Sequence, residues 1–337
     1  MKAQAQTKTS MRNKILAALL LPGLVFLAAC GDAASGGGNG NGDGNGAGAA
    51  PSGAPPGGSI SADREGNPVT LPANIETVLS MGPSNTEILI ALGHGDKIIA
   101  TDTYSDNIEG LPADIPMFSM KASDGEQIIN LQPDVIFVTG MSKAGGDDHF
   151  KVVADAGICV LYMPSSGSLE AIKEDIRFIA AVMGSLAEGE AIVAEMEREI
   201  DRIWAIGKTI TDQKSVYFEI DAPPHLYSFG QNVFLHEMLE LIGARNVFGE
   251  NPNDWLSISD EAVVKENPDV ILTSVHYIED PVGDIKTRPG WGEITAVQNG
   301  DVYRIDTDAS NRPSHHVVKA MREMAEAIYP ELYGTGN

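Results

Sequence analysis

Short apolar runs alternate with helix-like segments along most of this chain, and the alternation occurs in both halves. The runs are KIIATD, DVIFVTG and CVLYMP in the first half, and SVYFEI, DVILTSV and DVYRID in the second. Buried strands that alternate with helical patterns are typical of sheets whose strands are largely parallel. The sequence therefore predicts an α/β fold with two lobes.

Two segments of the first half recur in the second. NLQPDVIFV (residues 130–138) returns as KENPDVILT (265–273), and EILIALG (87–93) returns as EMLELIG (237–243). The two spacings are 135 and 150 residues. Because they differ, the pattern indicates a loose duplication rather than a tandem repeat.

A long amphipathic segment lies between the halves. Ile192, Met196, Ile200 and Ile203 recur at helical spacing with charged residues opposite. A helix over 187–208 would be roughly 33 Å long, enough to connect two lobes and leave a ligand cleft between them. The expected units are an N-terminal lobe, an interlobe helical region and a C-terminal lobe, at 61–168, 169–210 and 211–337 respectively.

The N-terminus predicts export. Four basic residues precede an apolar stretch over 15–27, which runs into LAAC at Cys30. This pattern resembles a bacterial lipobox, which implies a signal peptide over 1–29, cleavage before Cys30 and diacylation of its thiol; an uncleaved anchor is the alternative. Residues 30–60 are rich in Gly, Asn, Ala and Pro and predict a flexible tether that spans roughly 30 Å.

The charge of the chain excludes some partners. The formal charge is −24, and removal of residues 1–29 leaves 19 basic against 47 acidic residues, which gives −28. Such an acidic surface argues against binding to nucleic acid or to anionic lipid.

Motifs for catalysis or direct metal binding are missing. The sequence has no G-x-S-x-G, H-E-x-x-H, paired-cysteine or P-loop pattern. Cys159 lies in an apolar run and is interpreted as a core residue. His315 and His316 are adjacent at the start of a predicted helix, where they are expected to point to different faces. We therefore expect no enzymatic activity, no cofactor and no direct metal ligand.

Five segments together resemble the helical-backbone substrate-binding proteins of ABC importers, the class III family for ferric siderophores, haem and cobalamin. They are MGPSNTEILIALG, IINLQPDVIFV, GQNVFLHEMLELIGARNVF, WLSISDEAVVKENPDVILT and RPGWGEITAVQNGDVYRID. The resemblance implies two Rossmann-like lobes joined by one long helix, with the ligand between them. It also implies an ABC permease and its ATPase subunits as partners of a monomeric protein, held by lipid on the extracytoplasmic face of the cell membrane.

The resemblance also implies that each lobe offers a surface glutamate to the permease. Glu87 matches the first and Glu240 the second, although the internal repeat pairs Glu87 with Glu237 instead. Glu87 has a second interpretation, because Ser84 and Glu87 fit a capping box in which their side chains satisfy helix N–H groups.

In the family, ligand residues come from loops at the carboxyl ends of strands. The matching residues here are Tyr104, Met120, Lys121, Thr139, Trp255, His276, Tyr277 and Arg312. Tyr104 and Trp255 could instead pack within the lobes, and Arg312 could pair with an acidic group.

The cationic side chains of Lys121 and Arg312 would attract an anionic iron chelate. We therefore expect a ferric siderophore, with haem as the next alternative and cobalamin after it. A ligand sensor that uses the same cleft and an extracellular enzyme are the competing classes.

Overall fold

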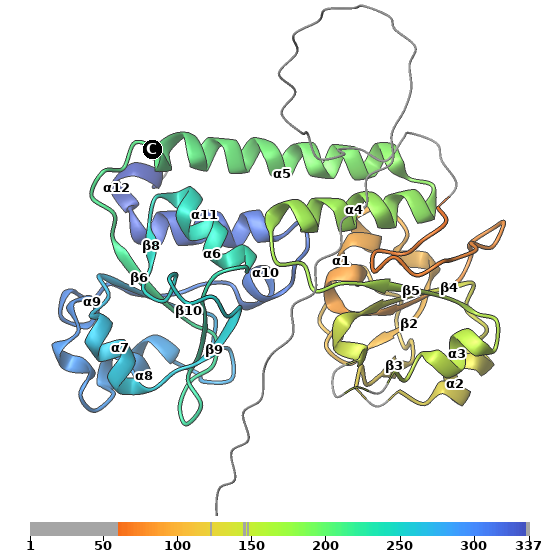
Figure 1. Ribbon diagram of the computed structural model, residues 1–337, viewed down its shortest axis with the longest axis horizontal. Coiled ribbons are helices and arrows are strands. Elements are labelled where there is room, and N and C mark those ends of the chain that lie inside the picture. Colours follow the sequence, from red (N-terminus) through yellow and green to blue (C-terminus); the bar gives the residue numbers. More distant parts are fainter. Residues whose placement is uncertain (1–59, 122, 144–145, 147, 335–337) are drawn as a thin grey trace, which may run out of the picture. The chain divides into compact units, whose positions relative to one another are not determined.

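The computed structural model describes residues 60–121, 123–143, 146 and 148–334 (Figure 1). The predicted signal peptide, Cys30 and all but the last residue of the predicted tether lie outside the described residues. Within the described residues, no helix is both long and apolar enough to cross a membrane.

The N-terminal lobe is built on a five-stranded sheet in which all neighbours are parallel, in the order β3-β2-β1-β4-β5. Its strands are β1 (Val78–Met81), β2 (Ile98–Asp102), β3 (Met117–Phe118), β4 (Val135–Thr139) and β5 (Cys159–Met163). Its helices are α1 (Pro83–Ala91), α2 (Gly125–Leu131) and α3 (Lys151–Asp155), with the 3-10 helices η1 (Gly95–Lys97) and η2 (Gly140–Lys143). The three apolar runs of the first half thus form β2, β4 and β5, as predicted.

The C-terminal lobe has a four-stranded parallel sheet in the order β11-β10-β6-β8 and a small antiparallel pair, β7-β9. The strands are β6 (Ser215–Glu219), β7 (Tyr227–Phe229), β8 (Arg245–Asn246), β9 (Trp255–Ser257), β10 (Val270–Thr273) and β11 (Val302–Arg304). The helices are α6 (Phe234–Ile242), α7 (Asp260–Glu266), α8 (Pro281–Thr287), η3 (Trp291–Glu293), α9 (Thr295–Asn299), α10 (Thr307–Asn311), α11 (Val317–Ile328) and α12 (Pro330–Tyr333). This confirms an α/β fold with two mainly parallel sheets.

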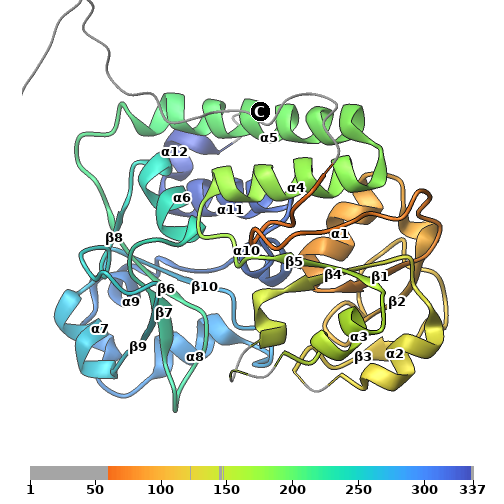
Figure 2. The same cartoon turned by 45° about the vertical axis from the view of Figure 1, so that its right-hand side comes forward.

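Helix α5 (Leu186–Gly207) lies along the same side of both lobes, and α4 (Leu169–Met183) lies beside it, from the N-terminal lobe to the middle of the molecule (Figures 1 and 2). Helix α5 matches the predicted interlobe helix within one residue at each end. Its Gly189 is required by the close approach of α4, because a Cβ there would lie 2.5 Å from the Cβ of Ala180. Helix α4 therefore packs directly against the long helix.

One apolar core is shared by the two lobes. Ile88 of α1, Ile176 of α4, Met196 of α5, Leu239 of α6 and Met321 of α11 are all buried in the same cluster. Since this cluster crosses from lobe to lobe through the helices, a large change in the angle between the lobes would have to disturb packed side chains.

The duplication predicted from the sequence is visible in hydrogen bonds. Asp134, just before β4, accepts from the backbone N–H and hydroxyl of Thr77, and Asp269, just before β10, accepts from the same groups of Ser215. In both lobes this aspartate therefore fixes the start of the neighbouring central strand.

Candidate functional site

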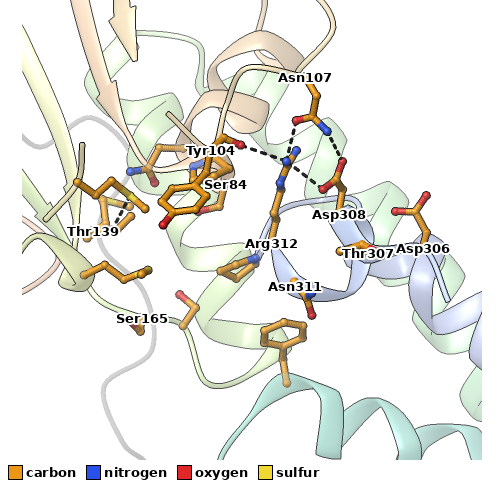
Figure 3. A pocket seen from close by; sticks show the side chains of 18 of the residues that line it. Ser84, Tyr104, Asn107, Thr139, Ser165, Asp306, Thr307, Asp308, Asn311 and Arg312 are labelled. Atoms are coloured by element: carbon orange, nitrogen blue, oxygen red, sulfur yellow. Dashed lines mark hydrogen bonds and ion pairs between the residues drawn. The ribbon is translucent and has the colours of Figure 1, made fainter. Parts of the chain in front are cut away.

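A cavity of about 1200 Å³ lies between the lobes and is lined by residues from both (Figure 3). Ser84, Tyr104, Thr139 and Ser165 lie on one side of the view, and Thr307 and Arg312 on the other. Most lining residues lie at the carboxyl ends of β1, β2, β4, β5, β10 and β11 or in the loops and first helical turns that follow. The carboxyl ends of parallel strands bring such loops together, which is why this edge holds the cleft.

Six of the eight predicted ligand residues line the cleft. These are Tyr104, Met120, Thr139, Trp255, His276 and Arg312. The other two do not: Lys121 is exposed outside the lining, and the hydroxyl oxygen of Tyr277 accepts a hydrogen bond from the N–H of Ala222 at 2.9 Å. The family resemblance was therefore a useful guide to the lining, but it could not say which of two neighbouring residues points inward.

Arg312 connects the two lobes at the wall of the cleft. Its Nη1 lies 2.9 Å from Glu87 Oε1, and its Nη2 donates to the carbonyl of Tyr104 at 3.2 Å and to Asn107 Oδ1 at 2.8 Å. Asp308 pairs with the same guanidinium at 2.9 Å (Figure 3). Five hydrogen-bonding positions of a guanidinium can hold all these partners, so the charge of Arg312 is satisfied within the protein.

Two further contacts complete this arrangement. The hydroxyl of Ser314 donates to Glu87 Oε2 at 2.5 Å, and Asn107 Nδ2 donates to Asp308 Oδ2 at 2.8 Å. We call Glu87, Asn107, Asp308, Arg312 and Ser314 the interlobe clamp. Glu87 and Asn107 belong to the N-terminal lobe and the other three to the C-terminal lobe, so the clamp fixes one lobe to the other.

Both predictions for Glu87 are wrong in their geometry. Helix α1 begins at Pro83 with Gly82 as its N-cap, and no side chain of the described residues caps it. Proline is favoured at the first helical position because its fixed φ suits a helix and its missing N–H needs no partner, so Ser84 lies inside the helix. Glu87 is 7% exposed and bound by the clamp, so it is not a surface glutamate.

Glu240 differs from Glu87, because its side chain is 65% exposed. Its carboxylate lies 3.5 Å from Nε2 of His236, one turn earlier in α6. A role for Glu240 in permease docking stays a prediction.

The prediction that Arg312 is an available cation for an anionic ligand is also not supported by the geometry. The alternative that it pairs with acidic groups describes the structure correctly, because Glu87 and Asp308 occupy its guanidinium. Glu87 and Arg312 are 225 residues apart in the chain, so their pairing leaves no local signal in the sequence.

Aromatic rings face the cleft from both lobes. Tyr104 is 55% exposed, and Trp255 is 45% exposed. The indole of Trp255 lies nearly parallel to the ring of Tyr227, with ring centroids 6.4 Å apart and an interplanar angle of 12°. This stack restricts the orientation of Trp255, so the indole is already held in place at the cleft wall.

The loop that carries Tyr104 is held by a buried carboxylate. Asp102, at the end of β2, accepts from the N–H of Tyr104 at 2.8 Å and from the hydroxyl of Ser105 at 2.6 Å. Burial raises the pKa of Asp102, although these two hydrogen bonds lower it in part. The carboxylate therefore positions the aromatic residue without entering the cleft lining itself.

Sequence reasoning missed the amides and hydroxyls of the lining. They are Ser84, Asn85, Thr103, Asn107, Ser165, Ser166, Thr307 and Asn311. Asn85 is 3% exposed, and its Nδ2 has no hydrogen-bond partner among the described residues. An unpaired buried donor is costly, so a ligand oxygen that accepted from it would gain free energy of binding. The position of Ser84 and Asn85 directly after a strand was the available signal.

No group of three or more His, Cys, Asp or Glu side chains within the described residues could hold a metal ion. The rings of His315 and His316 lie 4.0 Å apart, so the expectation that they diverge is wrong. Within the described residues Cys159 forms no disulfide, and it is half-buried at the start of β5, where burial raises the pKa of its thiol. Trp291 is fully buried and donates to Asp260, as expected for a packing residue.

Comparison with known proteins gives a consistent result. Residues 78–309 match the family model described as periplasmic binding protein. The "Uncharacterized ABC transporter substrate-binding lipoprotein YvrC" of Bacillus subtilis is 32% identical over 276 residues, which cover 80% of this chain and 85% of that protein. The "Vitamin B12-binding protein" of Vibrio parahaemolyticus is 25% identical over 252 residues, which cover 75% and 89%.

The fold is also found among solved structures. The crystal structure of a "possible" iron-binding (periplasmic solute-binding) protein from Staphylococcus epidermidis superposes with a TM-score of 0.66 and 26% identity. The match covers 76% of this chain and 99% of that one.

Proposed function

The chain belongs to the periplasmic binding protein family, among the substrate-binding proteins of ABC importers for iron chelates, haem and cobalamin, and we propose that its ligand is a corrinoid of the cobalamin class. It captures the corrinoid in the interlobe cleft and delivers it to a membrane permease. ATP hydrolysis belongs to separate ATPase subunits, and the chain has no catalytic activity of its own.

The size and chemistry of the cleft support a large, flat ligand with many amide groups. Its volume of about 1200 Å³ exceeds the usual range for drug-sized ligands. Tyr104 and Trp255 offer ring faces to a macrocycle. Asn85, Asn107 and Asn311 can exchange hydrogen bonds with the peripheral amides of a corrin.

The observation that carries the choice of ligand is that the guanidinium of Arg312 is already paired within the protein. The cleft lining contains five carboxylates and two guanidinium groups, and the clamp already neutralises Arg312. Only the guanidinium of Arg304 is therefore left for a ligand, so a strongly anionic ferric siderophore would keep most of its charges unpaired, at a cost in free energy. A corrinoid has a neutral body and a single phosphodiester, so it avoids this cost.

A ferric siderophore remains the second candidate, because the Staphylococcus epidermidis structure is named for iron binding. The expectation of a siderophore depended on Lys121 and Arg312 as available cations, and neither offers its charge to the cleft. If iron is the cargo, the chelate should be neutral or cationic. Haem would bring two carboxylates and would use a cleft side chain such as His276 as its axial ligand.

The remaining features of the proposal concern location and assembly. The lipid on Cys30 would hold a monomeric protein on the extracytoplasmic face of the membrane beside the permease. Glu240, as an exposed glutamate of the C-terminal lobe, would contact basic residues of the permease.

Tryptophan fluorescence tests the ligand. Of the three tryptophans, Trp255 lines the cleft, Trp204 is exposed on α5, and Trp291 is buried in the C-terminal lobe. We would titrate the full chain in detergent with cyanocobalamin, ferric hydroxamate, ferric citrate and haem, correct for ligand absorbance, and verify each affinity by calorimetry.

Saturable quenching by cyanocobalamin at sub-micromolar concentration, lost in Trp255→Phe and kept in the matched control Trp204→Phe, is the expected result. Binding of ferric hydroxamate alone would favour the second candidate. Preference for ferric citrate would contradict the charge argument.

A further inference from the structure

Arg304 carries the second guanidinium of the cleft lining, and it differs from Arg312 in its contacts with other side chains. Arg304 ends β11, an edge strand of the C-terminal sheet, and lines the cleft with an exposed side chain. In the described part of the chain, its side chain makes neither a hydrogen bond nor an ion pair. Its charge is therefore available to a ligand.

The acidic residues that follow Arg304 in the lining already have partners. Asp306 Oδ2 lies 2.6 Å from Lys319 Nζ, and Asp306 Oδ1 accepts from the N–H of Ala309 at 2.9 Å. Glu323 accepts from the N–H of Asp306 at 2.8 Å. These contacts hold the two carboxylates in a local network with Lys319, which explains why neither is drawn onto Arg304.

The chemistry of a corrinoid offers one natural partner for a single available guanidinium. The periphery of the macrocycle carries neutral amides, and a complete cobalamin has one anionic group, the phosphodiester of its nucleotide loop. A guanidinium binds phosphate oxygens through two parallel N–H···O bonds, which are shorter and stronger than neutral hydrogen bonds.

We propose that Arg304 binds the phosphodiester of the nucleotide loop and thereby selects complete cobalamins over corrinoids that lack the loop. This inference rests on the proposed function, because it specifies which part of the corrinoid meets which wall of the cleft. The macrocycle lies between the aromatic rings of the two lobes, and its loop lies toward the end of β11. Arg304 is then a specificity determinant, whereas Arg312 is a structural residue of the clamp.

The test compares two ligands that differ in the loop. Calorimetry on the full chain would measure the affinities of cyanocobalamin, which carries the phosphodiester, and dicyanocobinamide, which does not. Arg304→Gln should weaken the binding of cyanocobalamin about tenfold or more, because hydrogen bonds between charged groups are stronger than those between neutral groups. The affinity for dicyanocobinamide should change less than about twofold.

Arg245 provides a matched control. It lies on β8, the opposite edge strand of the same sheet, is also exposed, and is not part of the cleft lining. Arg245→Gln should leave both affinities unchanged. Arg304→Lys keeps the charge but cannot make two parallel hydrogen bonds, so it should cause an intermediate loss of affinity for cyanocobalamin only. The affinity of this variant for cyanocobalamin should fall further as salt is added.

Equal losses for both ligands in Arg304→Gln, or no loss for either, would overturn this inference and leave the proposed function standing. A wild-type chain that binds neither corrinoid would overturn the proposed function and this inference with it. Thermal unfolding of each variant would verify that the exposed substitutions leave the fold intact.

Discussion

Helices α1 and α6 occupy corresponding places in the two lobes, and each carries a glutamate at the same position of the duplicated sequence. A glycine with positive φ follows each helix: Gly93, two residues after the end of α1, at 84°, and Gly243, directly after α6, at 87°. Glu87 of α1 is buried and pairs with Arg312, whereas Glu237 of α6 is half-buried and accepts from the N–H of Leu169 at 2.8 Å.

Both glutamates reach across to the other half of the chain, but their partners differ in kind. Glu87 meets a full positive charge in a place that water hardly reaches. Glu237 meets the first turn of α4, where unpaired N–H groups and the helix dipole attract an anion more weakly. Both duplicated carboxylates therefore restrain the lobes, and Glu87 of α1 is expected to contribute more to the free energy of unfolding than Glu237 of α6.

The largest expected effect is that of Glu87→Ala. It would leave Arg312 mostly buried, with only Asp308 as its ionic partner, and loss of one member of a buried pair typically costs about 3–5 kcal/mol. Asp308 compensates in part, so we expect the free energy of unfolding to fall by about 3 kcal/mol in a urea titration. Glu240→Ala is the matched control, and a loss below about 1 kcal/mol for Glu87→Ala would contradict the clamp.

Removal of both members of the pair should cost less than removal of the carboxylate alone. In the double variant Glu87→Leu with Arg312→Met, neither member of the buried pair is left without the other, and apolar side chains of similar length fill the space. Only Asp308, whose side chain is 44% exposed, loses an ionic partner. We expect it to regain about 1–2 kcal/mol over Glu87→Leu. A double-mutant cycle with strictly additive losses would show that the two residues do not interact.

His315, a neighbour of the clamp, should also make stability depend on pH. His315 follows Ser314 and lines a small hollow with Glu87, Glu109, Asp306, Asp308, His316 and Lys319. Burial, with a further contribution from His316, lowers the pKa of His315 to about 4. The unfolded chain takes up a proton near pH 6.5 and the folded chain does not, so stability falls as the pH drops from about 6.5 toward 4.

The difference between wild type and His315→Gln isolates this effect. The variant cannot take up the proton, so its free energy of unfolding should fall less between pH 7 and pH 5, by on the order of 1 kcal/mol. Parallel pH profiles of the two proteins would show that His315 titrates alike in the folded and unfolded states.

A smaller loss is expected from Glu237→Ala. The change removes one charge-assisted acceptor from the start of α4, where the hydroxyl of Ser168 still accepts from the N–H of Ala171. The typical cost of losing such a cap is about 1 kcal/mol. If Glu237→Ala cost as much as Glu87→Ala, the two sides of the molecule would be energetically equivalent and our comparison would fail.

The comparison also shows what sequence patterns could and could not predict. The strands β2, β4, β5, β6, β10 and β11 and the interlobe helix followed from local periodicity, and the equivalence of Glu87 with Glu237 followed from the repeat. The partner of Glu87 did not, because Arg312 lies 225 residues away and its pairing depends on how the lobes meet. A free surface carboxylate and a buried, paired one have the same local sequence.

The same limit applied to the cleft. The resemblance to the family supplied six residues that line the cleft. The difference between Met120, which lines the cleft, and Lys121, which does not, depends on the conformation of a single turn. The state of Arg304 could not be predicted either, because it depends on whether Asp306 and Glu323 find partners elsewhere.

The smallest effect on stability is expected for Glu240→Ala, and this variant separates docking from folding. Glu240 is exposed and one turn beyond Glu237, so its loss should change the free energy of unfolding by less than about 0.5 kcal/mol. Affinity for the ligand should also be unchanged, because Glu240 is not in the cleft lining. If it meets basic residues of the permease, uptake of the ligand by cells should still fall, through slower or misoriented docking. Uptake equal to that of wild type, with the same amount of protein at the membrane, would show that Glu240 is not part of the docking surface. The difference between α1 and α6 would then consist only of the contacts of Glu87 in the clamp.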